Sequence, residues 1–285
     1  MLEQHVGPKL LTYSKEWATY TDKYTAYLRF INKVVGSTSS VYTQFEYTGI
    51  FLALLENSDN NPQLRNLRGQ IETAPNPSTV AQEALTCLPF DGIRIMEIGG
   101  PFGQILHAMG AEVWCVDPDI EGESGWQKLN WTYSPTSRAH LYHAVPHRIT
   151  FVNWETLIRE RNFDAIYSSD VLSTNSGASS DWRKHLPDFS GDYHEAQAEW
   201  VRVTTKNKSL EALARKEIFL VSALASKKGG LVMHKGDALA EIRPIAPEAG
   251  LDLIEKRFDY LFDSQTRQPY DGAELLVFRK QRDGV

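Results

Sequence analysis

The chain has 285 residues, of which 42% are hydrophobic and 23% charged, and a formal net charge of −6 at pH 7. This is the composition of an ordinary globular protein, and its acidic balance argues against long duplex nucleic acid as a partner, because nothing draws the whole chain to phosphate backbones. Two cysteines exclude a disulfide framework and no apolar run approaches the roughly 20 residues of a membrane span, so we expect a soluble, cytoplasmic protein without membrane contact.

The first 88 residues are predicted to be helical and are rich in aromatic side chains. Three helices with apolar residues at spacings of three and four are expected: residues 20–34, residues 41–55 and a weaker one after Pro77. Packing between helices explains the aromatic residues, although a tyrosine-rich cap over a pocket would look the same. We expect residues 1–88 to form a helical cap and substrate-binding segment, which could also serve as the surface of a homodimer.

From residue 93 onward, short β-rich runs alternate with helical stretches. The predicted strands are residues 93–98, 112–117, 148–152, 163–168 and 229–235, and the predicted helices are residues 103–110 and 209–228. Mostly hydrophobic strands separated by helices indicate a parallel sheet covered on both faces. The last two predicted strands, 251–262 and 273–280, are joined by a polar, turn-rich connection, which indicates an antiparallel pair.

The stretch RIMEIGGPFG, residues 94–103, places glycines directly after a predicted strand. Gly99, Gly100 and Gly103 lack side chains, which allows a bulky ligand to approach the backbone at this edge of a parallel sheet. Asp117 ends the next predicted strand, where a carboxylate can accept hydrogen bonds from the two hydroxyls of a ribose. The pairing predicts a nucleoside-containing cofactor but does not separate a nicotinamide dinucleotide from S-adenosylmethionine (SAM).

The segment MEIGGPFG resembles motif I of the class I SAM-dependent methyltransferases. Glu97 matches the acidic position of that motif, Gly99 and Gly103 match its outer glycines, and Pro101 replaces the middle glycine. Three later stretches follow in the order of the family. They are ITFVNWETL, which resembles the adenine-contacting stretch, NFDAIYSSDVLS, which resembles motif IV, and ASKKGGLVMHK, which resembles the turn before the fifth strand with Lys228 in place of the usual proline.

The resemblance implies a Rossmann-like α/β fold with a seven-stranded, mostly parallel sheet whose last strand is antiparallel. It implies a SAM-binding domain at residues 89–285, with an insertion at about 173–208, and S-adenosylhomocysteine (SAH) as the product. The residues implied to bind the cofactor are Glu97, Gly99, Gly100, Gly103, Asp117, Asn153, Trp154, Ser169 and Asp170.

Methyl transfer from a sulfonium is an in-line displacement, so alignment of the acceptor and exclusion of water can supply most of the catalysis. An oxygen or nitrogen acceptor can still require a base. The candidates are His185 and His194 in the long polar insertion, His234 on the fifth strand, and Asp170 at the edge of the site. No metal is expected, because the histidine and carboxylate spacings match no recognised closed site.

The leading interpretation is a SAM-dependent methyltransferase acting on an oxygen or nitrogen of a small-molecule metabolite, with an aromatic, biosynthetic compound as one expectation. An NAD(P)-dependent oxidoreductase would explain Gly99 and Asp117, but it leaves the later matches unexplained and lacks a Tyr-x-x-x-Lys pair. A protein or peptide methyltransferase and a non-catalytic binding protein remain open. Methylation of nucleic-acid bases is disfavoured, because no N/D-P-P-Y/F tetrad follows FDAIYS and no Pro-Cys nucleophile occurs.

Overall fold

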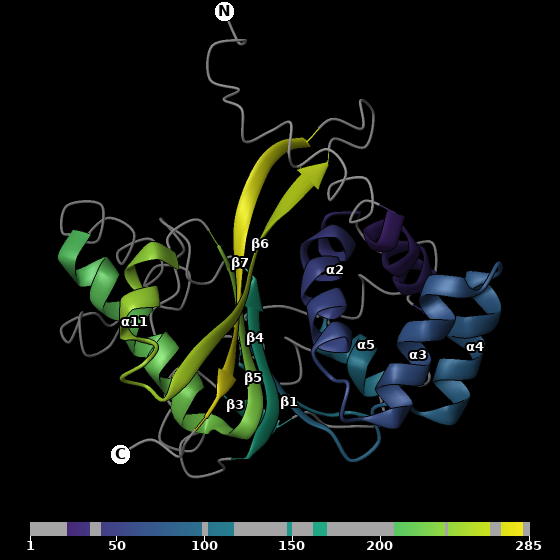
Figure 1. The fold of residues 1–285 in the computed structure, drawn as a ribbon, viewed down its shortest axis with the longest axis horizontal. Coiled ribbons are helices and arrows are strands. Elements are labelled where there is room, and N and C mark those ends of the chain that lie inside the picture. Colours follow the sequence, from purple (N-terminus) through teal and green to yellow (C-terminus); the bar gives the residue numbers. More distant parts are fainter. Residues whose placement is uncertain are drawn as a thin grey trace, which may run out of the picture.

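A central β-sheet lies between two groups of helices in the computed structural model (Figure 1). The structure describes residues 22–34, 41–98, 102–116, 147–149, 162–169, 208–236, 239–262 and 269–281. A helix over residues 22–34 and the helices α2 to α5 cover one face of the sheet, and α11 covers the other. This is the arrangement expected for a sheet that is buried on both sides.

The sheet has the strand order β3-β2-β1-β4-β5-β7-β6. Its strands are β1 (Arg94–Ile98), β2 (Glu112–Val116), β3 (His147–Ile149), β4 (Phe163–Ser169), β5 (Ser226–Gly236), β6 (Leu251–Phe262) and β7 (Pro269–Lys280). From β3 to β5 all neighbours pair in parallel, and β7 runs antiparallel to both β5 and β6. The predicted α/β class, the mostly parallel sheet and the antiparallel pair at the C-terminal end are confirmed.

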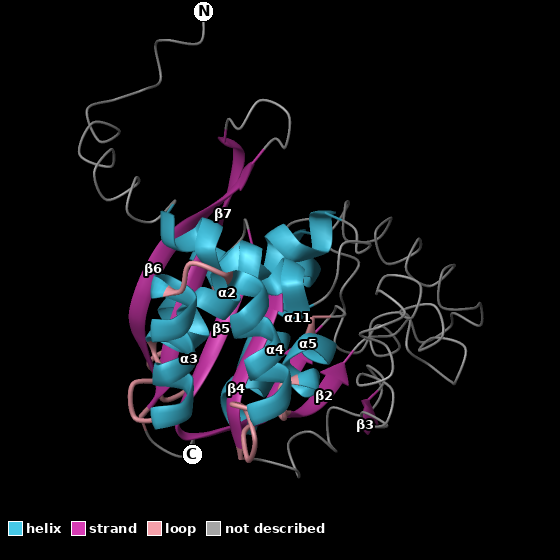
Figure 2. Ribbon diagram, turned by 90° about the vertical axis from the view of Figure 1, so that its right-hand side faces the viewer, coloured by secondary structure: helices cyan, strands magenta, loops and turns pink. Residues whose placement is uncertain are grey.

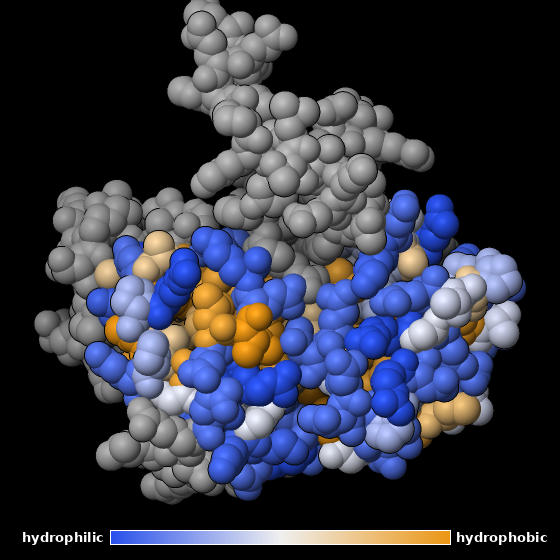
Figure 3. Space-filling view, viewed as in Figure 1, coloured by the Kyte–Doolittle hydropathy of each residue, from blue (hydrophilic) through white to orange (hydrophobic). Residues whose placement is uncertain are grey.

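The helices are α2 (Val41–Glu56), α3 (Pro62–Thr73), α4 (Pro77–Cys87), α5 (Gly103–Ala108) and α11 (Lys208–Ala225), with short 3₁₀ turns at η3 (Leu239–Glu241) and η4 (Arg243–Ile245). Seen from the side, α2, α3 and α4 lie in front of the strands (Figure 2). The face in Figure 3 is mostly hydrophilic, with hydrophobic residues showing over α11 and β6. Leu220 of α11 and Ile254 of β6 are large apolar residues that are 41% and 38% exposed.

Helix α3 was not predicted from the sequence, although its start carries a readable signal. The Asn61 side chain accepts hydrogen bonds from the backbone N–H groups of Gln63 and Leu64, and Pro62 occupies the first turn. Asn76 and Pro77 begin α4 in the same way. An N-cap asparagine followed by proline is a typical helix start, so the Asn-Pro pair that also begins the predicted α4 could have identified α3.

Helix α2 is buried on every side along its second half. All residues from 47 to 55 are buried, whereas the sequence prediction gave this helix one apolar face. A helix that is hydrophobic all round belongs inside a core. For the helix over residues 22–34 the predicted face is confirmed at Tyr24, Tyr27 and Ile31, each at most 3% exposed.

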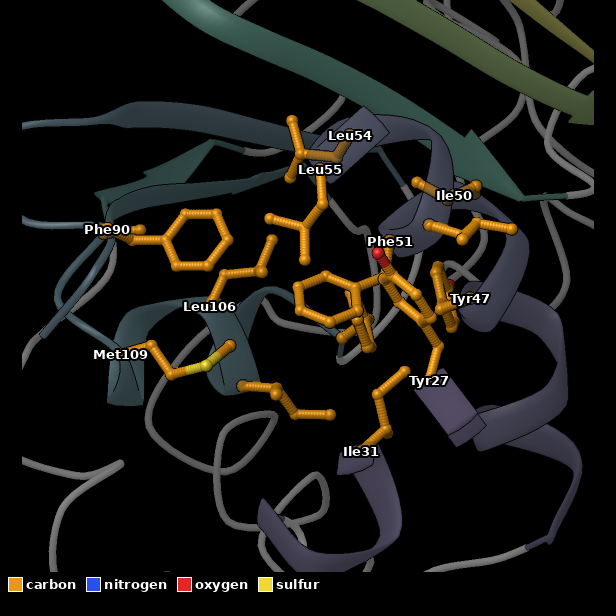
Figure 4. Close-up of a cluster of buried hydrophobic side chains, with 14 of the residues drawn as sticks. Tyr27, Ile31, Tyr47, Ile50, Phe51, Leu54, Leu55, Phe90, Leu106 and Met109 are labelled. Atoms are coloured by element: carbon orange, nitrogen blue, oxygen red, sulfur yellow. The ribbon is translucent and has the colours of Figure 1, made fainter. Parts of the chain in front are cut away.

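Two hydrophobic clusters fill the space on the two faces of the sheet. One joins the helices of residues 22–87 to α5 and to strands β1, β4, β5 and β7, and part of it is drawn in Figure 4. The other packs α11 against the opposite face. Strand alternation divides the side chains, so that Tyr167 of β4 joins the first cluster and Ile166 the second. The described residues on both sides of residue 88 therefore share one core, and a separate cap ending there stays a prediction.

Several predicted boundaries differ from the structure, most clearly where α11 ends and where β7 begins. Helix α11 ends at Ala225, so Lys227 and Lys228, which were predicted as helical, lie in β5. In this part of β5 the pairing with β4 jumps from Ser226 to Leu231, and Gly229 has a φ of +81°, which suits glycine. Strand β7 begins at Pro269 rather than at residue 273, because β6 continues to pair with it along the predicted turn-rich connection.

Candidate functional site

The strand order reverses between β1 and β4, and this point defines the candidate site. From β1 the chain passes through α5 to β2 on one side, and from β4 it passes through α11 to β5 on the other. Because the two connecting helices lie on opposite faces, a crevice is expected outside the carboxyl ends of these two strands. Ile98 of β1 pairs in register with Ser168 of β4 at that edge, next to the predicted glycine turn.

Glu97 is the buried acidic residue of this edge. Its Oε1 accepts a hydrogen bond from the backbone N–H of Phe102 at 3.0 Å, and its Oε2 accepts one from the N–H of Gly103 at 2.8 Å. The first N–H groups of a helix have no partner within the helix, and carboxylates are stabilised at this positive end. Glu97 and Gly103, both predicted cofactor residues, are therefore held together, with the carboxylate fixing the backbone at the start of α5.

Phe102, which sequence reasoning did not single out, is fully buried beside this hydrogen-bonded turn. Its ring is stacked on that of Tyr47 from α2, with centroids 5.0 Å apart and planes within 2° of each other. Edge-on contacts at 6.0 Å and 6.2 Å join it to Phe51 of α2 and Tyr167 of β4. The turn is thus held by its backbone through Glu97 and by a side chain through three aromatic rings.

His234, a predicted base, lies near the carboxyl end of β5 and is fully buried. Its Nδ1 is 2.7 Å from Oγ of Ser168, and its Nε2 has no hydrogen-bond partner among the described residues. Burial lowers the pKa of His234 to about 3. A general base works best with a pKa near the working pH, so this environment gives the predicted catalytic role no support.

The neighbouring positions Ser169 and Lys235 pair in register and are 8% and 1% exposed. Alternation along the strands places them on the face of the sheet that carries α2, together with Tyr167 and Met233. Ser169 was predicted to bind the cofactor and lies at the carboxyl end of β4, beside the switch point. Its location suits that prediction, while Lys235 had not been predicted.

The remaining predicted residues lie outside the described part of the chain, as does most of the predicted insertion at about 173–208. They are Gly99, Gly100, Asp117, Asn153, Trp154, Asp170, His185 and His194. In the described ranges, no group of three histidine, cysteine or acidic side chains could hold a metal ion. Nor is any helix in those ranges both long and apolar enough to cross a bilayer.

Comparisons with known proteins give matches in structure but none in sequence. No protein-family model matches the chain, and no curated protein is similar to it. TrmN from Thermus thermophilus is similar to it with 13% identity and a TM-score of 0.40, over 71% of this chain and 48% of TrmN. A protein from Streptococcus mutans assigned as a SAM-dependent methyltransferase aligns with 12% identity and a TM-score of 0.40, over 71% of this chain and 48% of that protein.

A third match is a protein from Galdieria sulphuraria assigned as a sarcosine dimethylglycine methyltransferase, with 11% identity, a TM-score of 0.40, and coverage of 74% of this chain and 89% of that one. The chain spans about half the length of the first two proteins. Similarity at this level concerns the course of the chain alone.

Proposed function

We propose that this chain is a SAM-dependent methyltransferase that transfers a methyl group to an oxygen or nitrogen of a small molecule. The observation that carries the proposal is the Glu97 carboxylate at the start of α5, where it accepts hydrogen bonds from two backbone N–H groups. The glycine turn and Asp117 are compatible with either a nicotinamide dinucleotide or SAM, and this contact helps to distinguish the two.

A nicotinamide dinucleotide places its pyrophosphate at the start of the helix after the first strand, where free N–H groups and the positive end of the helix attract it. In this chain the N–H groups of Phe102 and Gly103 already donate to Glu97, and the carboxylate adds a negative charge that repels phosphate. SAM carries a positive sulfonium and no phosphate. The same arrangement therefore opposes the dinucleotide without opposing SAM.

The proposed contacts to the nucleoside part of SAM come from the sequence. Asp117 follows Val116 in the chain, and Val116 pairs in register with Ile98, so β1 and β2 end at the same edge of the sheet. We assign Asp117 to the ribose hydroxyls and Asn153 and Trp154 to the adenine. Gly99 and Gly100 would allow close approach of the ligand to the backbone.

Bound SAM would supply the methyl group, which passes to the lone pair of the acceptor atom as the carbon–sulfur bond breaks. The part of the protein is to align the acceptor, exclude water and take up the acceptor proton where one is released. His185, His194 and Asp170 are the proposed groups for that proton, and the buried environment of His234 makes it the weakest of the four candidates. The net charge of −6 favours a small acceptor over a nucleic acid.

The cofactor is tested by thermal unfolding of the protein with SAM, SAH, NAD or NADP. At a ligand concentration of about 100 dissociation constants, binding adds about 2.7 kcal/mol, which corresponds to a rise in Tm of roughly 5–10 °C in a chain of this size. We expect a rise with SAM and SAH only. A rise with NAD or NADP alone would show that the chain is an oxidoreductase, and no rise with any ligand would favour a fold without cofactor.

The ribose assignment is tested by Asp117→Ala, with the exposed Asp91→Ala as the matched control. Loss of one charge-assisted hydrogen bond, about 1.5–3 kcal/mol, weakens SAH binding by about tenfold or more. Calorimetric titration should show this for Asp117→Ala only. Equal affinity in the two folded variants would refute the assignment.

The acceptor class is tested by incubation with SAM labelled in its methyl group and separated cell fractions of metabolites, RNA and protein. Label transferred to the metabolite fraction supports a small acceptor. Label in RNA or protein alone would overturn that part of the proposal and keep the methyltransferase.

A further inference from the structure

Helix α2 contacts Phe102, at the end of the predicted cofactor turn, through two aromatic side chains, Tyr47 and Phe51. Tyr47 of α2 lies flat against Phe102, with 5.0 Å between ring centroids and 2° between planes, and both side chains are at most 2% exposed. Tyr167 of β4 meets both rings edge-on, at 6.1 Å from Tyr47 and 6.2 Å from Phe102. Figure 4 shows Tyr47 on α2 in the cluster that also contains Phe51 and Leu106.

Phe102 is held in two different ways at once. Its backbone N–H donates to Glu97, which ties it to β1, and its ring is packed by α2 and β4. Of these elements, only α2 precedes the part of the chain that contains the parallel strands, which runs from β1 to β5. The position of Phe102, which follows the predicted glycine turn, therefore depends on a helix that is remote in sequence.

We infer that Tyr47 is a positioning residue for the cofactor turn, acting through Phe102, so that α2 helps to set the affinity for the cofactor. The inference rests on the proposed function, because it takes the turn to bind SAM. Without the Tyr47 ring, Phe102 gains space to adopt other side-chain conformations, and the turn spends less time in the arrangement held by Glu97. Apparent affinity falls in proportion to the fraction of molecules that are competent to bind.

A matched control exists in the same core. Phe30, from the helix over residues 22–34, is 1% exposed and stacks on Phe51 at 5.8 Å and 4°. It belongs to the same cluster as Tyr47, but its ring stacks on Phe51, which in turn meets Phe102 edge-on at 6.0 Å, so Phe30 is one ring further from the turn than Tyr47. Phe30→Leu should therefore lower stability as Tyr47→Leu does, without the effect on the turn. Tyr47→Phe retains the ring and should behave as the wild-type protein.

The experiment compares the full-length wild-type protein with Tyr47→Leu, Tyr47→Phe and Phe30→Leu. Hydrogen–deuterium exchange without ligand follows the amides of Phe102 and Gly103, and calorimetry measures the Kd for SAH. We expect Tyr47→Leu alone to speed exchange at these amides and to weaken SAH binding by about three- to tenfold, the range that the loss of one aromatic pair corresponds to. The other two variants should stay within about twofold of the wild-type Kd, a change smaller than one aromatic pair.

A second route covers the case in which Tyr47→Leu does not fold. Phe102→Leu should raise exchange at the Gly103 amide and weaken SAH binding, whereas Phe30→Leu should not. Where all variants fold, adding Tyr47→Leu to Phe102→Leu should cost little further affinity, because Tyr47 acts through Phe102.

Equal exchange and equal SAH affinity in Tyr47→Leu and Phe30→Leu would overturn the inference, as would unchanged exchange and affinity in Phe102→Leu. A wild-type protein that binds neither SAM nor SAH would refute the proposed function instead. Even then, the exchange of the unliganded protein decides whether Tyr47 orders the turn.

Discussion

Glu97→Gln is the change that tests the candidate site most directly. The glutamate accepts hydrogen bonds from two backbone N–H groups, one on each oxygen, at 3.0 Å and 2.8 Å. A glutamine at this position has the same shape but only one carbonyl oxygen. Its NH₂ group would face one of the two N–H groups, donor against donor, in a place where Glu97 is 0% exposed.

The magnitude follows from these contacts. Two charge-assisted hydrogen bonds of about 1.5–3 kcal/mol each would be replaced by one neutral bond of about 1 kcal/mol and by two buried donors that face each other. We therefore expect Glu97→Gln to lower the free energy of unfolding by about 3–5 kcal/mol, and Tm by about 10 °C in a chain of this size. SAH binding should weaken as well, because the turn loses the group that fixes its end.

The assay is urea unfolding followed by circular dichroism, with Glu112→Gln as the control. Glu112 lies on the adjacent strand β2, where its half-exposed carboxylate is 3.1 Å from Nε of Arg94 and accepts a hydrogen bond from Trp114. Solvent screens that pair, so Glu112→Gln should cost only about 1 kcal/mol. If Glu97→Gln were no more destabilising than Glu112→Gln, the carboxylate would not be what holds the start of α5, and the argument against a dinucleotide would fail with it.

Two further predictions concern the glycine that follows α5 and the buried histidine. In urea unfolding, Gly110→Ala should be more destabilising than Gly92→Ala by about 2 kcal/mol. Both glycines have a positive φ, of 102° and 75°, but only at Gly110 would the new Cβ meet Leu88 at 2.9 Å and a backbone nitrogen at 3.0 Å. Equal losses of stability would mean that the strain of the positive φ alone decides. Burial lowers the pKa of His234 from 6.5 to about 3. As the pH falls below about 6.5, this histidine therefore binds a proton in the unfolded chain but not in the folded protein, and the free energy of unfolding falls by about 1.4 kcal/mol per pH unit. The free energy of unfolding should therefore fall more steeply with acid in the wild-type protein than in His234→Gln, and equal slopes from pH 6.5 to 4.5 would show that His234 is not held neutral.

Local patterns in the sequence were sufficient to predict most of the sheet. FDAIYS, the run at residues 163–168, is short, apolar and bounded by polar residues, and it forms β4 with one further residue. The polar connection before residue 273 indicated an antiparallel pair, which β6 and β7 form. These features depend on neighbours in the chain, which is why periodicity and turn chemistry could identify them.

Contacts between distant residues were beyond the same reasoning. The burial of α2 on all sides depends on strands and helices far along the chain, and nothing local in the sequence of α2 states that Tyr47 will stack on Phe102. The pKa of His234 likewise follows from its burial, which the tertiary structure creates. The sequence identified His234 as a candidate base from its residue type and its place at a strand end. Its pKa, which decides whether it can act as a base, could not be known from the sequence alone.

The acidic residue and the last glycine of the motif form one physical unit, although the sequence presents them as separate signals. Glu97 lies in β1 and uses both carboxylate oxygens on the N–H groups of residues 102 and 103 at the start of α5. The same carboxylate occupies the place where the pyrophosphate of a dinucleotide would bind. We therefore propose that the charge at the start of α5, rather than the number of glycines before it, decides between the two cofactors.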